Sequence, residues 1–498
     1  MNRYFWAFLA FVLVWLALNA LSLNLFPVLD VCGDEALIGN AAWTWLNTGQ
    51  KALSVYPGIL GNVGPLWGAI YYGVIAVAFK LFGFGITVLR ATSLLWGLGT
   101  LVLTFFLGRA INGWRTGLIS AIILGCSYIF MASSHLGRFE SAASCFATGG
   151  VLLAYLAFKR HSGLLSLLSG LVFGTSILVH SVPSAVFAGA ALFFLFQRRY
   201  KHLGLMTAGY LAGLALLPAF NYAEFFKEHT ATHYYTGYLE EFIPLVLIRD
   251  PASLPAILLR KILGLPIWFI LGTHLESMYV LPIPARMAGA GNNPIDHYIL
   301  LGAALVSTAV QGRKHPFVPW VLWASLAVAI FFVPMVRFLY FPSFYPLLAV
   351  SCGLLFSGIE RRTRRALALS LFLFPGLLFT AISCWLGWKD MRARSASYSA
   401  IARLIPEDAG VGSTSGSFFW LFPGRSGILP RGKGLSADFL REHSIQYVVS
   451  EQPIDSVYGL DPEGLGMERV ARAEGGYITL LGGWGLERVD SVIVYRVK

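Results

Sequence analysis

Apolar segments recur from Phe5 to Gly387, and most approach the length of a helix that crosses a lipid bilayer, about 20 residues. Hydrophobic residues make up 56% of the 498 residues and charged residues 12%, against roughly 25% charged in soluble domains. The mean hydropathy is +0.67. We expect an all-α polytopic membrane protein whose spans are Phe5–Pro27, Val88–Ala110, Thr116–Ser133, Ser141–Phe158, Leu164–His180, Pro183–Phe196, Leu203–Tyr222, His297–Val310, Phe317–Val333, Phe344–Ser357 and Ala366–Gly387.

Basic residues lie in the connections between these spans and indicate the topology. Cytoplasmic loops of membrane proteins carry the excess of Lys and Arg. The predicted spans place all the basic clusters on one side: Arg3, Arg109 with Arg115, Lys159 with Arg160, Arg198, Arg199 and Lys201, Arg313 with Lys314, and Arg361, Arg362, Arg364 and Arg365. Because the basic residues that give the net charge of +12 lie in loops on one side of the membrane, we expect a lipid bilayer as partner and no nucleic acid. The positions of the basic loops predict a cytoplasmic N-terminus and a C-terminal region outside. We expect the membrane to be a bacterial inner (plasma) membrane.

Two further apolar stretches, 65–82 and 257–275, do not fit this count, because one more crossing would reverse the side of the basic loops. We interpret the first as interfacial or re-entrant within a long outer loop, 28–87. The second would be a shallow hairpin within another outer loop, 223–296. The total is therefore about 11–13 transmembrane helices, depending on whether these two stretches cross.

The composition changes near Trp388, which suggests a second domain. Residues 1–388 would form the membrane domain and residues 389–498 a small extracytoplasmic α/β domain. Within the latter we expect a short amphipathic helix, Ser395–Pro406, and strands over the segments IQYVVSE and SVIVYRV. Five scattered cysteines indicate neither a disulfide framework nor a metal site.

An acidic pair, Asp34 and Glu35, follows the first span and begins a predicted helix, Glu35–Asn47, that Gly49 ends. One interpretation is a helix cap, because carboxylates are favourable at the positive end of a helix. The other is catalytic. The helix is apolar over much of its surface, and partial desolvation raises the basicity of a carboxylate, which suits a general base.

A second acidic position lies in the turn between two spans, in the segment SSHLGRFESAAS. Glu140 begins a span two residues after Arg138. The pair is either an interfacial ion pair or a second carboxylate that shares a cavity with Asp34, since ionisable residues at membrane depth are functional candidates. His135 in the same segment is expected to be an interfacial polar residue.

Other polar residues lie at predicted outer edges. Arg337 lies among aromatic residues in VRFLYFPSFYP, where its side chain either reaches the interface or binds a phosphate. His180 marks the break between two spans and is structural or lines a cavity. His229 and His233 have helical metal-ligand spacing without a third ligand nearby, so metal binding stays an open question.

Four motifs in this order resemble the GT-C glycosyltransferases, in particular the branch of protein O-mannosyltransferases and the lipid A aminoarabinose transferase. They are DEALIGNAAWTWLNTG, GPLWGAIYYGVIAVAFKLFG with the following LRATSLLWGLG, HLGRFESAASCFATGG, and RFLYFPSFYPLLAV. Together they cover most of the first 200 residues and part of 319–357. The resemblance implies a GT-C-like fold and transfer of a sugar from a polyprenyl-phosphate carrier to an acceptor hydroxyl on the outer face, with inversion.

By this resemblance Asp34 would be the base, with Glu35 and Glu140 lining the cavity; Arg138, Arg337 and His180 would face the donor phosphate or the cavity. The acceptor would be a lipid, glycan or protein, and no redox or nucleotide cofactor is implied. The segment GILGNVGPLW lacks the acid and lysine found in the aminoarabinose branch, and Glu140 stands where several relatives have Asp. These departures put a lipid A acceptor and a bound metal in doubt.

Two other classes of protein are compatible with the sequence. A transporter or flippase for a lipid-linked or polar substrate would place charges or broken helices at mid-membrane. Here the acidic residues cluster at the outer edge, which favours chemistry at the surface. An assembly protein would tolerate neutral residues at positions 34 and 140.

Overall fold

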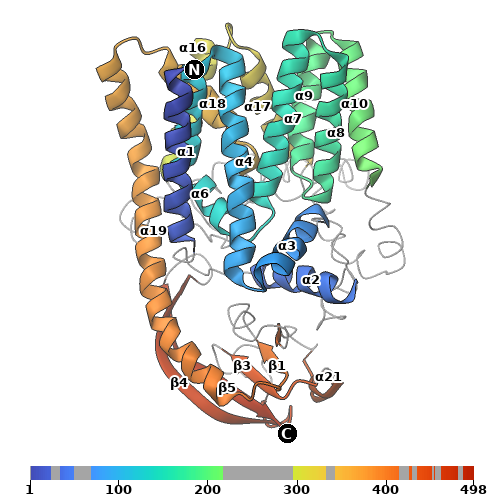
Figure 1. The fold of residues 1–498 in the computed structure, drawn as a ribbon, viewed down its shortest axis with the longest axis vertical. Coiled ribbons are helices and arrows are strands. Elements are labelled where there is room, and N and C mark those ends of the chain that lie inside the picture. Colours follow the sequence, from blue (N-terminus) through green and yellow to red (C-terminus); the bar gives the residue numbers. More distant parts are fainter. Residues whose placement is uncertain are drawn as a thin grey trace, which may run out of the picture.

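The computed structural model describes residues 2–23, 34–49, 69–216, 295–332, 342–413, 426–428, 435–442, 444–450, 454, 461–480 and 486–498. A helical bundle occupies one end of the molecule and a small sheet the other (Figure 1). The bundle helices are α1 (Arg3–Ser22), α4 (Ile86–Asn112), α5 (Trp114–Gly125), α6 (Tyr128–His135), α7 (Glu140–Arg160), α8 (Gly163–Thr175), α9 (Pro183–Phe196), α10 (Tyr200–Leu214), α16 (Ile295–Gln311), α17 (Phe317–Phe332), α18 (Tyr345–Ser357) and α19 (Arg362–Leu404).

Each predicted span overlaps one of these helices over its described residues, with α5 and α6 together forming the third. Among the described residues α1, α4 and α7 are long and apolar enough to cross a membrane singly, and α5 with α6, which meet at 66°, would make a fourth. The short 3-10 helix η1 (Ser176–Leu178) extends α8. Six further apolar helices among the described residues are shorter, 10–17 residues.

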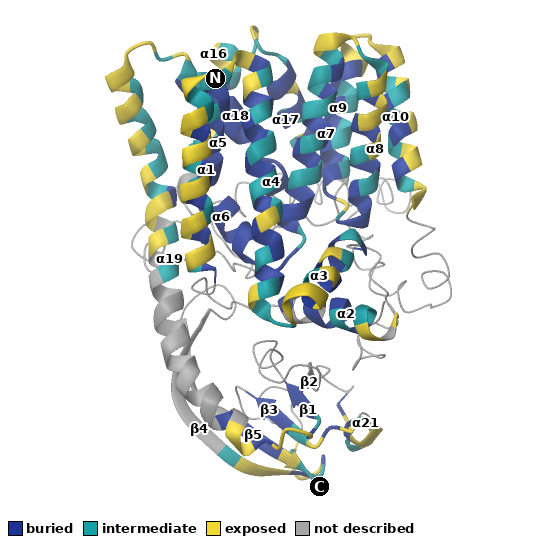
Figure 2. Cartoon of the chain, in the orientation of Figure 1, coloured by how far each residue is buried: buried dark blue, intermediate teal, exposed yellow. Residues whose placement is uncertain are grey.

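The outer faces of the bundle are apolar. Leu21 on α1 is 80% exposed and Leu371 on α19 is 67% exposed, whereas α6 and α18 lie almost entirely inside (Figure 2). Exposed apolar surface on this scale needs a nonaqueous environment. The bundle is therefore built to contact lipid.

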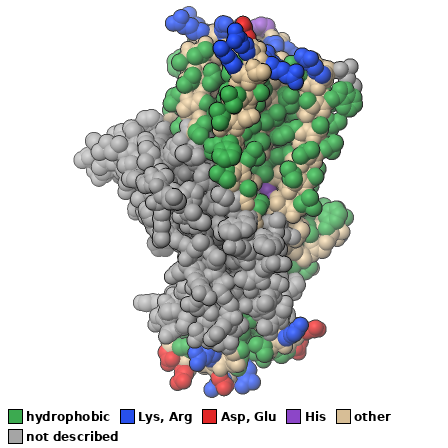
Figure 3. All heavy atoms as spheres, turned by 90° about the vertical axis from the view of Figure 1, so that its left-hand side faces the viewer, with side chains coloured by type: hydrophobic (Ala, Val, Ile, Leu, Met, Phe, Trp, Pro, Cys, Tyr) green, Lys and Arg blue, Asp and Glu red, His purple; other side chains and the backbone are tan. Residues whose placement is uncertain are grey.

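The basic connections meet at one end of the bundle (Figure 3). Lys159, in the last turn of α7, donates to the Ala110 carbonyl oxygen near the end of α4 at 2.7 Å. Arg115, at the start of α5, donates to the Ile359 carbonyl oxygen at 3.3 Å. These contacts agree with the prediction that the clusters share one side; that this side is cytoplasmic stays a prediction.

Helices α8 and α10 approach closely because glycines face each other along both. A Cβ atom built on Gly170 would overlap the Met206 carbonyl oxygen, and one on Gly209 would overlap the Leu167 carbonyl oxygen. Small residues allow helix backbones to approach in this way within membranes. The close contact between α8 and α10 therefore depends on glycine at these positions.

We expect Gly209→Ala to lower the free energy of unfolding by about 1–3 kcal/mol, the usual cost of overpacking. The added methyl group would meet the Leu171 backbone nitrogen at 2.9 Å, so backbone must move. Gly204→Ala on the same helix is the control, since nothing lies within 4 Å of its Cβ position. Thermal unfolding in detergent measures both variants; equal midpoints would contradict the prediction.

Two short helices, α2 (Asp34–Thr48) and α3 (Ala69–Phe82), lie at the bundle end that faces the sheet (Figure 1). The predicted helix after the acidic pair is confirmed: Gly49 ends it with φ +71°, a conformation that favours glycine. Their shared core contains Ile38, Ala42, Tyr71 and Phe79. Helix α3 occupies most of the stretch 65–82 that was interpreted as interfacial.

The C-terminal sheet has the strand order β2-β1-β3-β5-β4. Its strands are β1 (Val411–Ser413), β2 (Ser426–Ile428), β3 (Tyr447–Ser450), β4 (Met467–Leu480) and β5 (Leu486–Val497), with the small helix α21 (Ala437–Glu442) beside them. The predicted strands correspond to β3 and part of β5. Val411, Val449 and Val494 pack on Ile401 at the end of α19.

The predicted start of the short helix Ser395–Pro406 was wrong. This segment is the last part of α19, a single helix of 43 residues that starts at Arg362 in the bundle. Nothing between Trp388 and Ser395 breaks the helix, because this stretch contains neither Gly nor Pro. The proposed domain boundary at residue 388 therefore falls inside a helix.

Candidate functional site

The predicted site residues that the structure describes lie in three segments at the bundle end that faces the sheet: the start of α2, the turn between α6 and α7, and the connection from η1 to α9 (Figure 1). Asp34 is the first residue of α2. Its side chain lies outside those that the structure describes. Glu35, Arg138, Glu140 and His180 are all placed.

The Glu35 carboxylate is buried, with 3% of the residue exposed, and it contacts two other parts of the chain. It accepts hydrogen bonds from Arg90 Nε at 2.9 Å and Arg90 Nη2 at 2.8 Å. It also accepts the backbone N–H of Gly137 at 2.8 Å. One carboxylate therefore joins α2 to α4 and to the turn before α7.

Arg90 is the functional-site residue that sequence reasoning missed. It lies on α4 inside a predicted span, and it is 0% exposed. Besides the fork to Glu35, its Nη1 donates to the Leu23 carbonyl oxygen at the end of α1, 3.2 Å. A buried charge requires such partners. An arginine within an apolar segment was the available signal.

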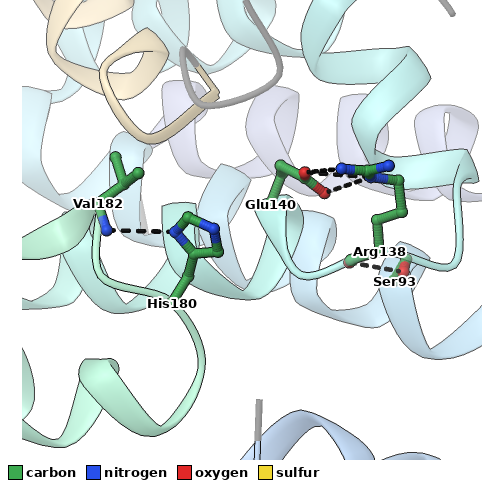
Figure 4. Close-up of polar contacts among 5 residues, drawn as sticks. All are labelled: Ser93, Arg138, Glu140, His180 and Val182. Carbon is green, nitrogen blue, oxygen red and sulfur yellow. Dashed lines mark hydrogen bonds and ion pairs between the residues drawn. The ribbon is translucent and has the colours of Figure 1, made fainter. Parts of the chain in front are cut away.

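Arg138 and Glu140 form a second buried ion pair within the turn. Arg138 Nη2 lies 2.9 Å and Nε 3.1 Å from Glu140 Oε1 (Figure 4). Glu140 is 3% and Arg138 7% exposed, and Glu140 begins α7. The ion pair considered from sequence is therefore present, and it presents a fixed guanidinium group at the bundle edge.

Helix α3 packs against this turn. The Tyr71 hydroxyl and Ser93 Oγ are 2.6 Å apart, and Ser93 Oγ lies 3.4 Å from the Arg138 carbonyl oxygen. The rings of Tyr71 and Tyr72 contact Phe139 edge-on, with centroids 5.3 and 5.6 Å away. Aromatic side chains thus hold the interfacial helix on the segment that carries Arg138 and Glu140.

His180 lies in the connection after η1, and its Nδ1 accepts the Val182 N–H at 3.2 Å (Figure 4). Its ring centroid is 6.3 Å from that of Phe139. The imidazole therefore borders the turn that carries the Arg138–Glu140 pair.

His135 lies on the other side of the turn and is fully buried. Its Nδ1 is 2.7 Å from the Met131 carbonyl oxygen, and its Nε2 is 3.0 Å from Ser22 Oγ. These contacts join α6 to the end of α1. They agree with the structural role expected for His135, although its burial is deeper than an interfacial position implies.

Several predicted residues lie outside the described residues: Arg337, His229 and His233. In the part of the chain that the structure describes, no three His, Cys, Asp or Glu residues gather as they would around a metal ion. The described site contains two carboxylates, two guanidinium groups and an imidazole. Each guanidinium group is paired with one of the carboxylates.

Comparison with known proteins gives two matches to parts of the sequence. The profile of the dolichyl-phosphate-mannose-protein mannosyltransferase family matches residues 70–222. An uncharacterized protein of Aquifex aeolicus (strain VF5) is 30% identical over 187 residues, 37% of this chain and 36% of the relative. The chain thus matches about a third of the length of this curated relative.

Solved structures match the fold over nearly the whole chain. ArnT from Cupriavidus metallidurans bound to undecaprenyl phosphate gives a TM-score of 0.60 at 12% identity, covering 100% of this chain and 99% of that one. The chain has the GT-C glycosyltransferase fold. A second GT-C protein, the Archaeoglobus fulgidus oligosaccharyltransferase in complex with Zn and sulfate, gives 0.52 at 14% identity, covering 88% and 67%.

The GT-C fold confirms the predicted fold class, a polytopic helical membrane protein with a small C-terminal sheet. The agreement extends to ArnT in the apo state, with a TM-score of 0.56 at 13% identity over 99% of this chain and 97% of that one. At these identities the likeness concerns the fold. The chain is accordingly an integral membrane protein of the GT-C architecture.

Proposed function

We propose that this protein is a membrane glycosyltransferase that moves a sugar from a polyprenyl-phosphate carrier to an acceptor hydroxyl at the outer membrane face, with inversion. The GT-C fold, the mannosyltransferase profile over residues 70–222 and the undecaprenyl phosphate bound in ArnT support this donor class. The acceptor would be a lipid, a glycan or a protein.

One observation carries the proposal. The hydrogen bond from the Gly137 N–H to Glu35 brings together segments 102 residues apart in sequence. It places the helix that Asp34 begins beside the turn that holds Arg138 and Glu140. This contact supports the assignment of both acidic motifs to one site at the edge of the apolar bundle, where a lipid-linked donor would enter from the bilayer.

In this reaction the acceptor hydroxyl gives its proton to a carboxylate, and its oxygen forms a bond to the anomeric carbon. The bond from that carbon to the phosphate oxygen breaks, and polyprenyl phosphate leaves with both electrons. We assign the base to Asp34. Glu35 is less suited, because three donors already occupy its carboxylate.

The leaving phosphate gains negative charge as the bond breaks, so a fixed cation nearby stabilises the transition state. We assign this role to Arg138, which Glu140 holds in a bidentate pair, and to Arg337 at the edge of a late span. His180 would complete the polar wall of the site. A divalent cation remains an additional candidate for this charge.

The test uses purified protein in lipid vesicles, a panel of polyprenyl-phosphate sugars and an acceptor extract. We expect wild type to release free polyprenyl phosphate from at least one donor. Glu140→Gln should reduce the rate at least tenfold, because Arg138 loses its charged partner. The exposed Glu442 on α21 supplies the matched control, Glu442→Gln, which should retain the wild-type rate.

Release that survives in Glu140→Gln would contradict the role given to the pair. No release by folded wild-type protein from any donor would contradict the proposed activity. A transporter or flippase for a lipid-linked or polar substrate would then become the leading hypothesis, and it predicts movement of labelled lipid between leaflets without cleavage.

A further inference from the structure

The Glu35–Arg90 pair lies next to the proposed chemistry without being suited to take part in it. Glu35 is 3% and Arg90 0% exposed, and every contact described for the pair is to the protein itself. A buried ion pair contributes little net stability, because desolvation of both charges offsets their attraction. Stability alone therefore does not explain why the Glu35–Arg90 pair lies at this place in the fold.

We propose that Glu35 and Arg90 form a positioning device that locks the start of α2 to the turn 136–140. Arg90 on α4 is the fixed point, since it also binds the Leu23 carbonyl oxygen at the end of α1. Glu35 then binds Arg90 and the Gly137 N–H at once. Asp34 and Glu140, neighbours of these contacts in sequence, are thereby set at a constant separation.

The turn 136–140 lies close enough to α4 for these contacts because it contains Gly137. A Cβ atom on Gly137 would overlap the Leu89 side chain, and Leu89 directly precedes Arg90. Gly137 can therefore approach α4 closely enough for its N–H to reach Glu35. The Ser93 hydroxyl, 3.4 Å from the Arg138 carbonyl oxygen, anchors the next residue of the turn to the same helix.

The positioning role rests on the proposed function, since it supposes that Asp34, Arg138 and Glu140 act on one substrate. The contact between α2 and the turn does not depend on that function. One experiment must therefore test this contact in the absence of substrate, and a second must measure turnover in the same variants.

Backbone hydrogen–deuterium exchange, followed by mass spectrometry on full-length protein in lipid nanodiscs without substrate, reads the lock. We expect Glu35→Gln and Arg90→Lys to exchange roughly tenfold faster than wild type in peptides covering 34–49 and 134–141 together. A lysine keeps the charge but lacks the fork that holds both oxygens. Peptides of α8 and α10 should be unchanged.

The matched control is Glu468→Gln, which breaks the exposed pair between Glu468 and Arg496 in the sheet and should leave both site peptides unaffected. Faster exchange in only one of the two segments, or in neither, would overturn the proposal. Global loss of protection in both variants would also overturn it, because the pair would then serve the whole bundle.

The second readout is release of polyprenyl phosphate by the same variants. If Glu35 is a positioning residue, kcat should fall at least tenfold in Glu35→Gln, while the KM for the donor changes less than threefold. The donor would still bind, but the catalytic side chains would less often be aligned with it. Unchanged kcat with faster exchange would leave a purely structural lock and overturn positioning. If wild type has no activity, the proposed function fails, and the exchange result still decides the lock.

Discussion

Asp34→Asn should lower the rate of sugar transfer by a factor of about 10²–10⁴, the usual contribution of a general base. The amide keeps the size of the carboxylate but cannot accept the proton of the acceptor hydroxyl. Donor binding should persist, because the cations assigned to the phosphate are intact. The measurement is release of polyprenyl phosphate, paired with binding of the donor to the same preparation.

Asp438→Asn supplies the control. Asp438 lies in the exposed helix α21 and pairs with Arg441 at 2.8 Å, with its side chain 90% exposed. The same chemical change there should leave transfer unaltered. A wild-type rate in Asp34→Asn would remove Asp34 from the chemistry and reduce it to a helix cap.

The second large effect is on stability. Arg90→Met should lower the free energy of unfolding by about 3–5 kcal/mol, because it leaves the Glu35 carboxylate buried without its charged partner. The variant also loses the hydrogen bond to the Leu23 carbonyl oxygen. Thermal unfolding in detergent, followed by intrinsic fluorescence, measures the change.

The double variant Arg90→Met with Glu35→Gln should recover part of this loss, since no unpaired charge then remains. Arg496→Met is the exposed control, and exposed ion pairs contribute little. A midpoint in Arg90→Met equal to that of wild type would contradict the buried pair as described.

The helices of the bundle could be predicted from the sequence because each depends on local composition. A run of apolar residues specifies a span whatever lies elsewhere in the chain. The helix α2 was predicted for the same reason, since Asp34 and Gly49 are local start and stop signals. The domain boundary predicted at Trp388 lies inside α19, because a change in composition does not by itself interrupt a helix.

The sequence pointed to most residues of the candidate site, but not to Arg90 or to its pairing with Glu35. Asp34, Glu35 and Glu140 are conspicuous as acids beside apolar spans, and the close spacing of Arg138 and Glu140 already suggested an ion pair. Arg90 was passed over because its partner is 55 residues away in sequence. Periodicity and composition carry no information on such contacts, which only the packing of α2, α4 and the turn creates.

The continuity of α19 ties the sheet mechanically to the bundle. At 1.5 Å per residue its 43 residues extend about 65 Å, roughly twice the hydrocarbon thickness of a bilayer. The length of the helix therefore sets the distance between the sheet and the bundle, and its helical twist sets the rotation of the sheet about the helix axis. Inserting a single residue along it would turn the sheet by about 100° and raise it by about 1.5 Å.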